Sequence, residues 1–149
     1  MNVAGQIEPD EDLGRRLYSR SSAKRARRSR VPHTEFMPKA TPMNISVDRI
    51  SMADQAGADI SNIARVEGAS RPGSFRGWAF IANSIAGRNG RKTMASPTRT
   101  NPYHGEIILP EMARDDKDER TRHAQELADA SQWREARSPD LAAVRDLQS

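Results

Sequence analysis

Residues 91–110 have the sequence RKTMASPTRTNPYHGEIILP, and this stretch decides the fold class that we expect. Residues 93–95 and 104–109 predict two short strands, in the second of which Ile107 and Leu109 face opposite to Ile108. Between them, residues 96–102 are rich in Ser, Thr, Asn and Pro, a composition typical of a loop. The stretch therefore predicts two paired strands joined by a polar loop.

Further extended segments are predicted towards the N-terminus. Residues 44–50 alternate apolar and polar side chains, which places Ile45 and Val47 on one face of a strand. Residues 31–38 contain two prolines, which lack backbone donors, so this segment suits an edge strand or an extended loop.

Three helices are predicted from apolar side chains that recur at helical spacing. They cover residues 52–65, 75–86 and 118–133, and residues 75–86 form the expected central buried helix. The order of strands and helices predicts an α+β fold, in which a small antiparallel sheet of three or four strands packs against two or three helices, with mobile termini.

The distribution of apolar residues predicts the extent of the domain. The apolar fraction is 36%, and the Leu, Ile, Val and Phe residues concentrate between Phe36 and Trp133. We therefore expect a charged, disordered N-terminal tail at residues 1–30, a core domain at 31–133, and a polar C-terminal tail or short helix at 134–149.

Composition removes several classes of function. The chain has no cysteine, which excludes disulfides, thiolate metal sites and catalysis by a cysteine nucleophile. No apolar run approaches the roughly 20 residues that cross a bilayer, and no signal-peptide pattern begins the chain, so we expect a cytoplasmic protein without membrane contact. Histidine and carboxylate spacings typical of metal sites are missing, as are the GxxxxGK and GxGxxG phosphate loops. We expect neither a metal nor a cofactor.

A basic run at residues 15–30 is the first candidate binding segment. It carries eight Lys and Arg residues without one acidic residue, a pattern that attracts nucleic-acid phosphates or an acidic protein surface. An alternative is a solvated basic tail that binds nothing specifically. The candidate nucleic-acid-binding residues are Arg20, Lys24, Arg25, Arg27, Arg28 and Arg30.

His104 is the first candidate catalytic residue. It follows Asn101-Pro102-Tyr103, where the proline restricts Asn101 to extended conformations. Histidine titrates near neutral pH, so at the mouth of a strand it can act as a general acid or base. His33, beside Glu35, is the second catalytic candidate, whereas His123 is expected on the surface of the C-terminal helix.

The hydroxyls, amides and guanidinium groups near His104 predict an anion site. An alternative is that the loop is ordinary turn structure and that His104 packs at a sheet edge. The candidate ligand-binding residues are Arg49, Ser96, Thr98, Arg99 and Asn101.

Several short motifs carry a resemblance to known sequences. They are Phe36-Met37-Pro38, ISVDR at 45–49, the alanine-rich segment 78–86, GRKT at 90–93, and Ser96-Pro97 followed by NPYHGEI at 101–107. Together they resemble a group of uncharacterised bacterial proteins in which a Ser-Val strand precedes a Pro, Asn-Pro, His and Ile pattern. The resemblance covers residues 31–133 and implies no established activity, so it assigns no role to any residue.

Two function hypotheses follow from these residues. The first is a small domain that binds a phosphate-bearing ligand, RNA or a nucleotide, near His104, with metal-independent phosphodiester cleavage or transfer by His104 and His33. The second is a non-catalytic interaction module, or an adaptor or inhibitor in phage–host conflict, that binds a nucleic acid or an acidic protein through the basic tail.

Overall fold

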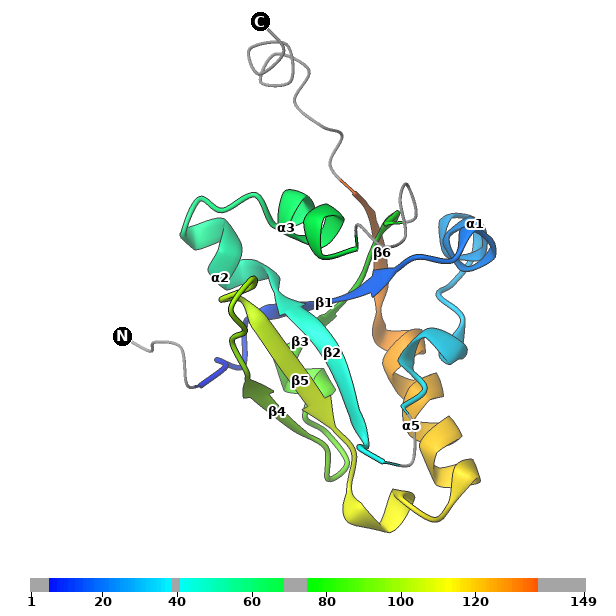
Figure 1. Ribbon diagram of the computed structural model, residues 1–149. Coiled ribbons are helices and arrows are strands. Elements are labelled where there is room, and N and C mark those ends of the chain that lie inside the picture. The colour runs from blue at the N-terminus through cyan, green and yellow to red at the C-terminus, as the bar shows by residue number, and fades with distance from the viewer. Residues whose placement is uncertain (1–5, 39–40, 69–74, 137–149) are drawn as a thin grey trace, which may run out of the picture.

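Residues 6–38, 41–68 and 75–136, which the computed structural model describes, build one antiparallel sheet of six strands in the order β4–β5–β2–β1–β3–β6 (Figure 1). The strands are β1 (Asp12–Leu17), β2 (Asn44–Arg49), β3 (Gly77–Ala82), β4 (Lys92–Ala95), β5 (His104–Ile108) and β6 (Gln132–Glu135). The helical elements are α1 (Arg20–Arg28), η1 (His33–Phe36), α2 (Ile50–Gln55), α3 (Ile60–Glu67), α4 (Asn83–Ala86), η2 (Glu111–Ala113) and α5 (Lys117–Ala130), of which η1 and η2 are 3-10 turns. The predicted α+β class is confirmed, but the predicted sheet of three or four strands is too small.

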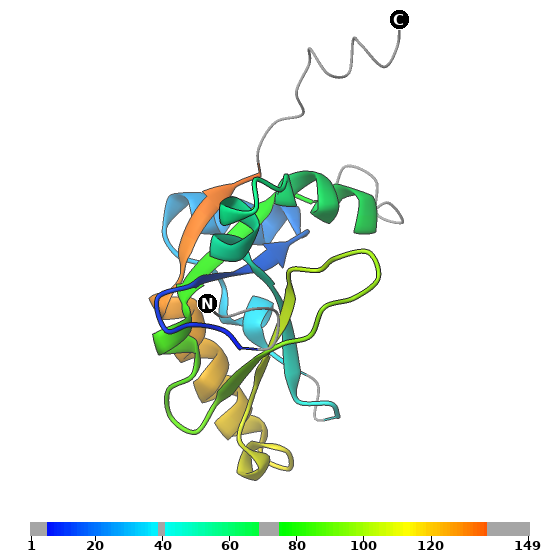
Figure 2. The ribbon, with the colours of Figure 1, turned by 90° about the vertical axis from the view of Figure 1, so that its left-hand side faces the viewer.

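The two faces of the sheet are covered by different helices. Alternating side chains of the central strands, such as Leu13 and Val47, pack with Leu127 of α5 and Phe36 of η1 in the larger core. On the other face, α2 and α3 cover Trp78 in a smaller core. Figure 2 shows α3 and α5 on opposite sides of the strands. Within the described ranges, no helix combines the length and the apolar character that crossing a membrane requires.

The predicted disordered tail at residues 1–30 is wrong for residues 12–28. β1 lies inside the sheet between β2 and β3, and both Leu13 and Leu17 are fully buried. α1 packs on the domain through the small residues Ala23 and Ala26, which allow close approach. The charges of the basic run favour a disordered tail, but its residues Leu17, Ala23 and Ala26 are buried in the protein. The domain therefore starts before residue 31 and extends through β6, past residue 133.

The predicted central helix at residues 75–86 is also wrong. Its apolar run forms β3, where Trp78, Ala79 and Ile81 are all buried. A short continuous apolar run fits a buried strand as well as a buried helix, and here the pairing with β1 along its whole length favours the strand.

Smaller differences have local causes. The predicted helix at 52–65 is divided into α2 and α3 at Gly57, whose φ of +69° ends a helix readily. The segment at 31–38 forms η1 instead of a strand. The predicted C-terminal tail at 134–149 starts inside β6, and residues 137–149 lie outside the described residues. The remaining strands at 44–50, 93–95 and 104–109 and the C-terminal helix are confirmed within a few residues, α5 ending at Ala130 before β6.

A buried polar cluster joins α4 to α5. Arg91, whose side chain is 0% exposed, donates hydrogen bonds to the carbonyl of Ala86 (2.8 Å), to Glu126 Oε1 (2.8 Å) and to His123 Nδ1 (2.8 Å). His123, expected on the surface, is in fact only 2% exposed. Burial lowers the pKa of His123, and the charges of Arg91 and Arg122 lower it further. The ring therefore accepts from Arg91 as a neutral group.

This cluster predicts a loss of stability in mild acid. Below 6.5, the pKa of an unperturbed histidine, the unfolded chain takes up a proton at His123 while the folded chain still does not. The free energy of unfolding is therefore expected to fall as the pH drops through this range. Urea unfolding at about pH 7.5 and about pH 5.5 measures the effect, and His123→Gln should remove it. The pKa of Glu126 is lowered from 4.5, so its contribution is lost only at more acidic pH. An unchanged pH dependence in the His123→Gln variant would contradict this assignment.

Candidate functional site

A cleft opens where β1 and β2 separate. The two strands pair only at Leu13↔Arg49 and Gly14↔Asp48, and beyond these pairs they diverge (Figure 1). Two adjoining pockets of about 460 and 300 Å³ fill the space between them. We call them together the β1–β2 cleft. Its lining residues are Arg15, Arg16, Tyr18 and Glu67, which both pockets share, with Ser19, Glu35 and Gly68 in the larger pocket and Ser46, Val47, Asp48, Thr98 and His104 in the smaller one.

Buried Asp48 organises the floor of the cleft. Its side chain is 2% exposed and accepts two hydrogen bonds from Arg16, at 2.7 and 2.8 Å. Trp78 Nε1 and Asn101 Nδ2 each donate a further bond, both at 2.9 Å. One carboxylate thereby fixes the position of Arg16 and ties the β4–β5 loop to the sheet.

Glu67, at the end of α3, closes one side of the cleft. Arg16 Nη2 donates to Glu67 Oε1 at 2.8 Å, and the hydroxyl of Thr100 donates to Glu67 Oε2. Figure 2 shows the β4–β5 loop reaching towards α3. Burial alone would raise the pKa of Glu67, but the hydrogen bonds from Thr100 and Arg16 and the charges of Arg16 and His104 outweigh it and lower the pKa. Glu67 is therefore an ionised carboxylate at neutral pH.

Arg15 is a cation held by carbonyl groups. Its Nε donates to the main-chain oxygen of Glu35 at 2.8 Å, and its Nη1 donates to that of Ser46 at 3.0 Å. Among the described residues Arg15 forms no salt bridge, and Oε1 of the nearby Glu35 carboxylate accepts a hydrogen bond from Ser22 Oγ. Burial lowers the pKa of Arg15, whereas the charge of Glu35 raises it in part. A bound anion would offset the cost of burying this charge.

His104 stands beside Asp48 on the neighbouring strand β5. Its ring is half-buried, and Nδ1 lies 2.8 Å from Ser96 Oγ and 3.0 Å from the carbonyl oxygen of Ser96. A carbonyl oxygen only accepts hydrogen bonds, so Nδ1 carries a proton in this arrangement. Nε2, which has no hydrogen-bond partner within the described part of the chain, is the nitrogen left for a ligand. This geometry suits proton transfer.

The structure brings four of the predicted site residues together. His104 and Thr98 line the cleft, and Ser96 lies behind the His104 ring. Asn101 is fully buried, with Nδ2 bound to Asp48 and Oδ1 accepting from the Tyr103 amide, so it supports the site from beneath.

The other predicted residues lie elsewhere. Arg49 points to the opposite face of the sheet from Asp48, where its Nη2 binds Glu11 at 2.9 Å and the carbonyl of Gln6 at 3.1 Å. Arg99 is exposed on the β4–β5 loop and His33 lies in η1, and neither lines the cleft. The expected grouping of His33 and Arg49 with His104 is therefore wrong.

Several residues of the cleft were not predicted from the sequence: Arg15, Arg16, Tyr18, Asp48 and Glu67. Asp48 binds Arg16, which is 32 residues away, and Arg16 binds Glu67, which is 51 residues away, so no local spacing reveals them. The one indication in the sequence was that charged residues stand in or beside apolar strand segments. Such residues need a partner when they are buried.

Comparison of the chain with family models, with curated proteins and with solved structures finds no match. Residues 6–38, 41–68 and 75–136 contain no group of three or more His, Asp or Glu side chains placed to hold a metal ion.

Proposed function

We propose that the β1–β2 cleft binds a phosphate of RNA or of a nucleotide, and that His104 transfers a proton during phosphodiester cleavage. One observation carries this proposal. The cleft wall holds a histidine whose Nδ1 is fixed by Ser96, in the same cavity as Arg15, a cation without a carboxylate partner among the described residues.

Arg15 marks the one candidate phosphate position among the lining residues of the cleft. Arg16 and Asp48 neutralise each other through two short hydrogen bonds, which leaves Arg15, Glu35 and Glu67 as the remaining charges. Of these only Arg15 attracts an anion, and it lies with His104 in the smaller pocket. A guanidinium offers paired donors that match phosphate oxygens. We therefore assign phosphate binding to Arg15, in place of Arg49 and Arg99.

Glu67 and His104 supply the two proton transfers of RNA cleavage. The ionised Glu67 accepts the proton of the ribose 2′-hydroxyl as its oxygen forms the new bond to phosphorus. The bond from phosphorus to the 5′-oxygen breaks, and the protonated His104 ring donates the Nε2 proton to that leaving oxygen. The products are a 2′,3′-cyclic phosphate and a 5′-hydroxyl, and both side chains regain their protonation states from water. The two Ser96 oxygens, both within hydrogen-bond distance of Nδ1, fix the orientation of the ring.

The test of this proposal uses the 2′-hydroxyl. The full-length chain is incubated with a short single-stranded RNA and with DNA of the same sequence, and the ends of the products are identified by mass. RNA should be cleaved to cyclic phosphate ends, whereas DNA, which lacks the nucleophile, should remain intact. Equal cleavage of DNA, or 5′-phosphate ends on the RNA products, would overturn the mechanism.

The phosphate assignment makes a separate prediction. Arg15→Gln is expected to weaken nucleotide binding by about tenfold or more, because a charge-assisted hydrogen bond contributes about 1.5–3 kcal/mol. Arg99→Gln, on the exposed loop outside the cleft, is the matched control and should bind as the wild type does. Isothermal titration with a nucleoside monophosphate measures both, and equal losses in the two variants would contradict the role of Arg15.

A further inference from the structure

The outer side of α1 is a dense basic surface. Arg20, Lys24, Arg25 and Arg28 are exposed, whereas Ser22, Ala23 and Ala26 on the opposite side are buried. None of these four cations forms an ion pair within the part of the chain that the structure describes. We call these four residues the α1 basic face.

The other two cations of the basic run are already engaged. Arg27 pairs with both carboxylate oxygens of Glu135 and lies over the ring of Trp133, 5.5 Å from its centroid. Arg30 lies 3.6 Å from Asp129. The six predicted nucleic-acid-binding residues therefore divide into four open cations and two that fix α1 to the domain.

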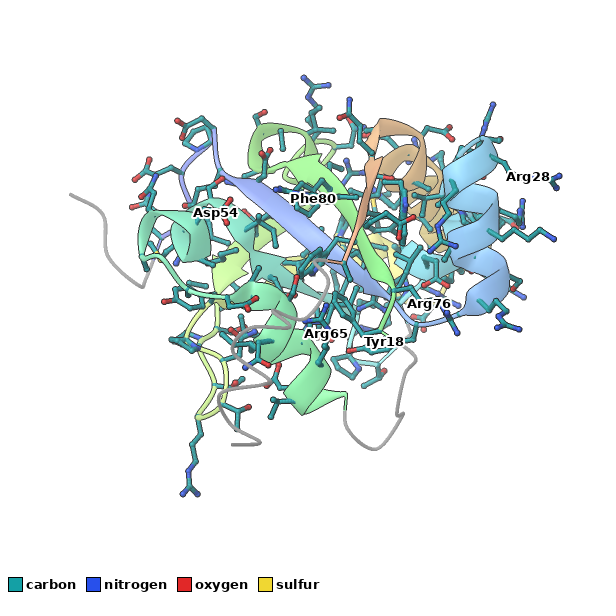
Figure 3. The ribbon with its side chains drawn as sticks, turned by 90° about the horizontal axis from the view of Figure 1, so that it is seen from above. Tyr18, Arg28, Asp54, Arg65, Arg76 and Phe80 are labelled. Carbon is teal, nitrogen blue, oxygen red and sulfur yellow. The ribbon has the colours of Figure 1, made fainter. Side chains whose placement is uncertain are left out.

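The α1 basic face begins at the rim of the β1–β2 cleft. Ser19 caps α1 by accepting a hydrogen bond from the Ser22 amide, and the same Ser19 lines the larger pocket. Arg20 follows it directly in the chain. Figure 3 shows Tyr18 and Arg76 between α3 and α1, with Arg65 on α3 and Arg28 on the outer side of α1. The α1 basic face therefore starts at the edge of the larger pocket.

Aromatic rings lie along the same region. Tyr18 contacts Phe75 with ring centroids 6.1 Å apart, and Phe75 contacts Trp78 at 4.9 Å. Tyr18 and Phe75 are only half-buried. Cations beside partly exposed rings are typical of surfaces that bind single-stranded nucleic acid, because phosphates contact the charges and bases stack on the rings. An acidic protein surface would use the charges alone.

We infer that a single strand of RNA leaves the β1–β2 cleft past Tyr18 and crosses the α1 basic face, so that the ligand is an oligonucleotide and not a mononucleotide. This inference rests on the proposed function, which places one phosphate in the cleft. It specifies the ligand as single-stranded RNA and places a second contact surface, the α1 basic face, outside the β1–β2 cleft.

A charge-matched pair of variants tests the inference in the full-length chain. The test variant is Lys24→Gln/Arg25→Gln/Arg28→Gln, and the control is Arg88→Gln/Lys92→Gln/Lys117→Gln, which removes three exposed cations from other elements. Fluorescence anisotropy measures binding of a labelled single-stranded RNA of about 12 nucleotides over a salt series. The test variant should bind about tenfold or more weakly at low salt, and its slope of log affinity against log salt should be shallower by about 2. The control should change both far less.

Each outcome separates this inference from the proposed function. Equal losses in the two triple variants, or equal affinity for double-stranded RNA, would overturn the single-strand path. Competition by polyglutamate as effective as that by RNA would also overturn it, in favour of an acidic protein partner. Both variants should bind a nucleoside monophosphate as the wild type does, because the cleft is intact. If the wild type binds no monophosphate but binds RNA through α1, the proposed function fails and the α1 surface stands as a non-catalytic interface.

Discussion

Replacing Asp48 with alanine is expected to lower the free energy of unfolding by about 3 to 5 kcal/mol, the cost of removing one partner of a buried ion pair. The Asp48 side chain is 2% exposed, and Arg16, Trp78 and Asn101 all donate to it. Without the carboxylate, the indole and the amide lose their acceptor inside the protein, and Arg16 loses two of its hydrogen bonds while it keeps the one to Glu67. Urea unfolding followed by circular dichroism measures the change.

The matched control is Asp54→Ala, an exposed aspartate on α2, which should change the free energy of unfolding by less than about 0.5 kcal/mol. A double-mutant cycle with Arg16→Met separates the ion pair from the other two bonds. A loss below about 1 kcal/mol for Asp48→Ala would show that the network contributes little to stability. It would contradict the role of Asp48 in holding Arg16 and the β4–β5 loop in place.

Replacing His104 with alanine is expected to reduce the rate of RNA cleavage by about 10²- to 10⁴-fold, the usual contribution of a positioned general acid. The folded state should survive, because the ring is half-buried at the cleft wall and, among the residues that the structure describes, hydrogen-bonds only to Ser96. RNA affinity should change much less than the rate, since Arg15 and the α1 basic face carry the charge. Single-turnover cleavage and anisotropy binding give the two quantities separately.

His33→Ala is the matched control, because it removes the other predicted catalytic histidine, which lies in η1 outside the cleft. Its cleavage rate should equal that of the wild type. Ser96→Ala removes the hydroxyl but leaves the carbonyl that holds Nδ1, so it should slow cleavage by about tenfold or less. Equal rates for His104→Ala and the wild type would favour the non-catalytic interaction module instead.

The order of apolar and polar residues correctly predicted those elements for which it fits only one type of secondary structure. Residues 44–49 alternate apolar and polar side chains because one face of β2 is buried against α5, and this alternation is visible in the sequence. The run Gly77–Ala82 is apolar on both faces because β3 is covered on both sides, and such a run does not separate helix from strand. The sequence did not predict β1, because its two buried residues, Leu13 and Leu17, are neighbours of the charged residues that line the cleft.

The site was predicted in part for a similar reason. Ser96, Thr98, Asn101 and His104 belong to one loop and the strand that follows, so their proximity is a property of the chain itself. Arg49 was wrongly included because neighbouring residues in a strand point to opposite faces, and Asp48 took the side that faces the cleft.

The α+β class, the β4–β5 pair and the position of a histidine beside a hydroxyl-rich loop follow from local pattern, because they depend on spacings of a few residues. The tertiary fold, in contrast, places β1 in the sheet, separates it from β2 at the cleft, and brings Arg15, Arg16 and Glu67 to His104. Those neighbours come from strands and helices far apart in the chain, and their distances are set by sheet order and by the burial of apolar faces.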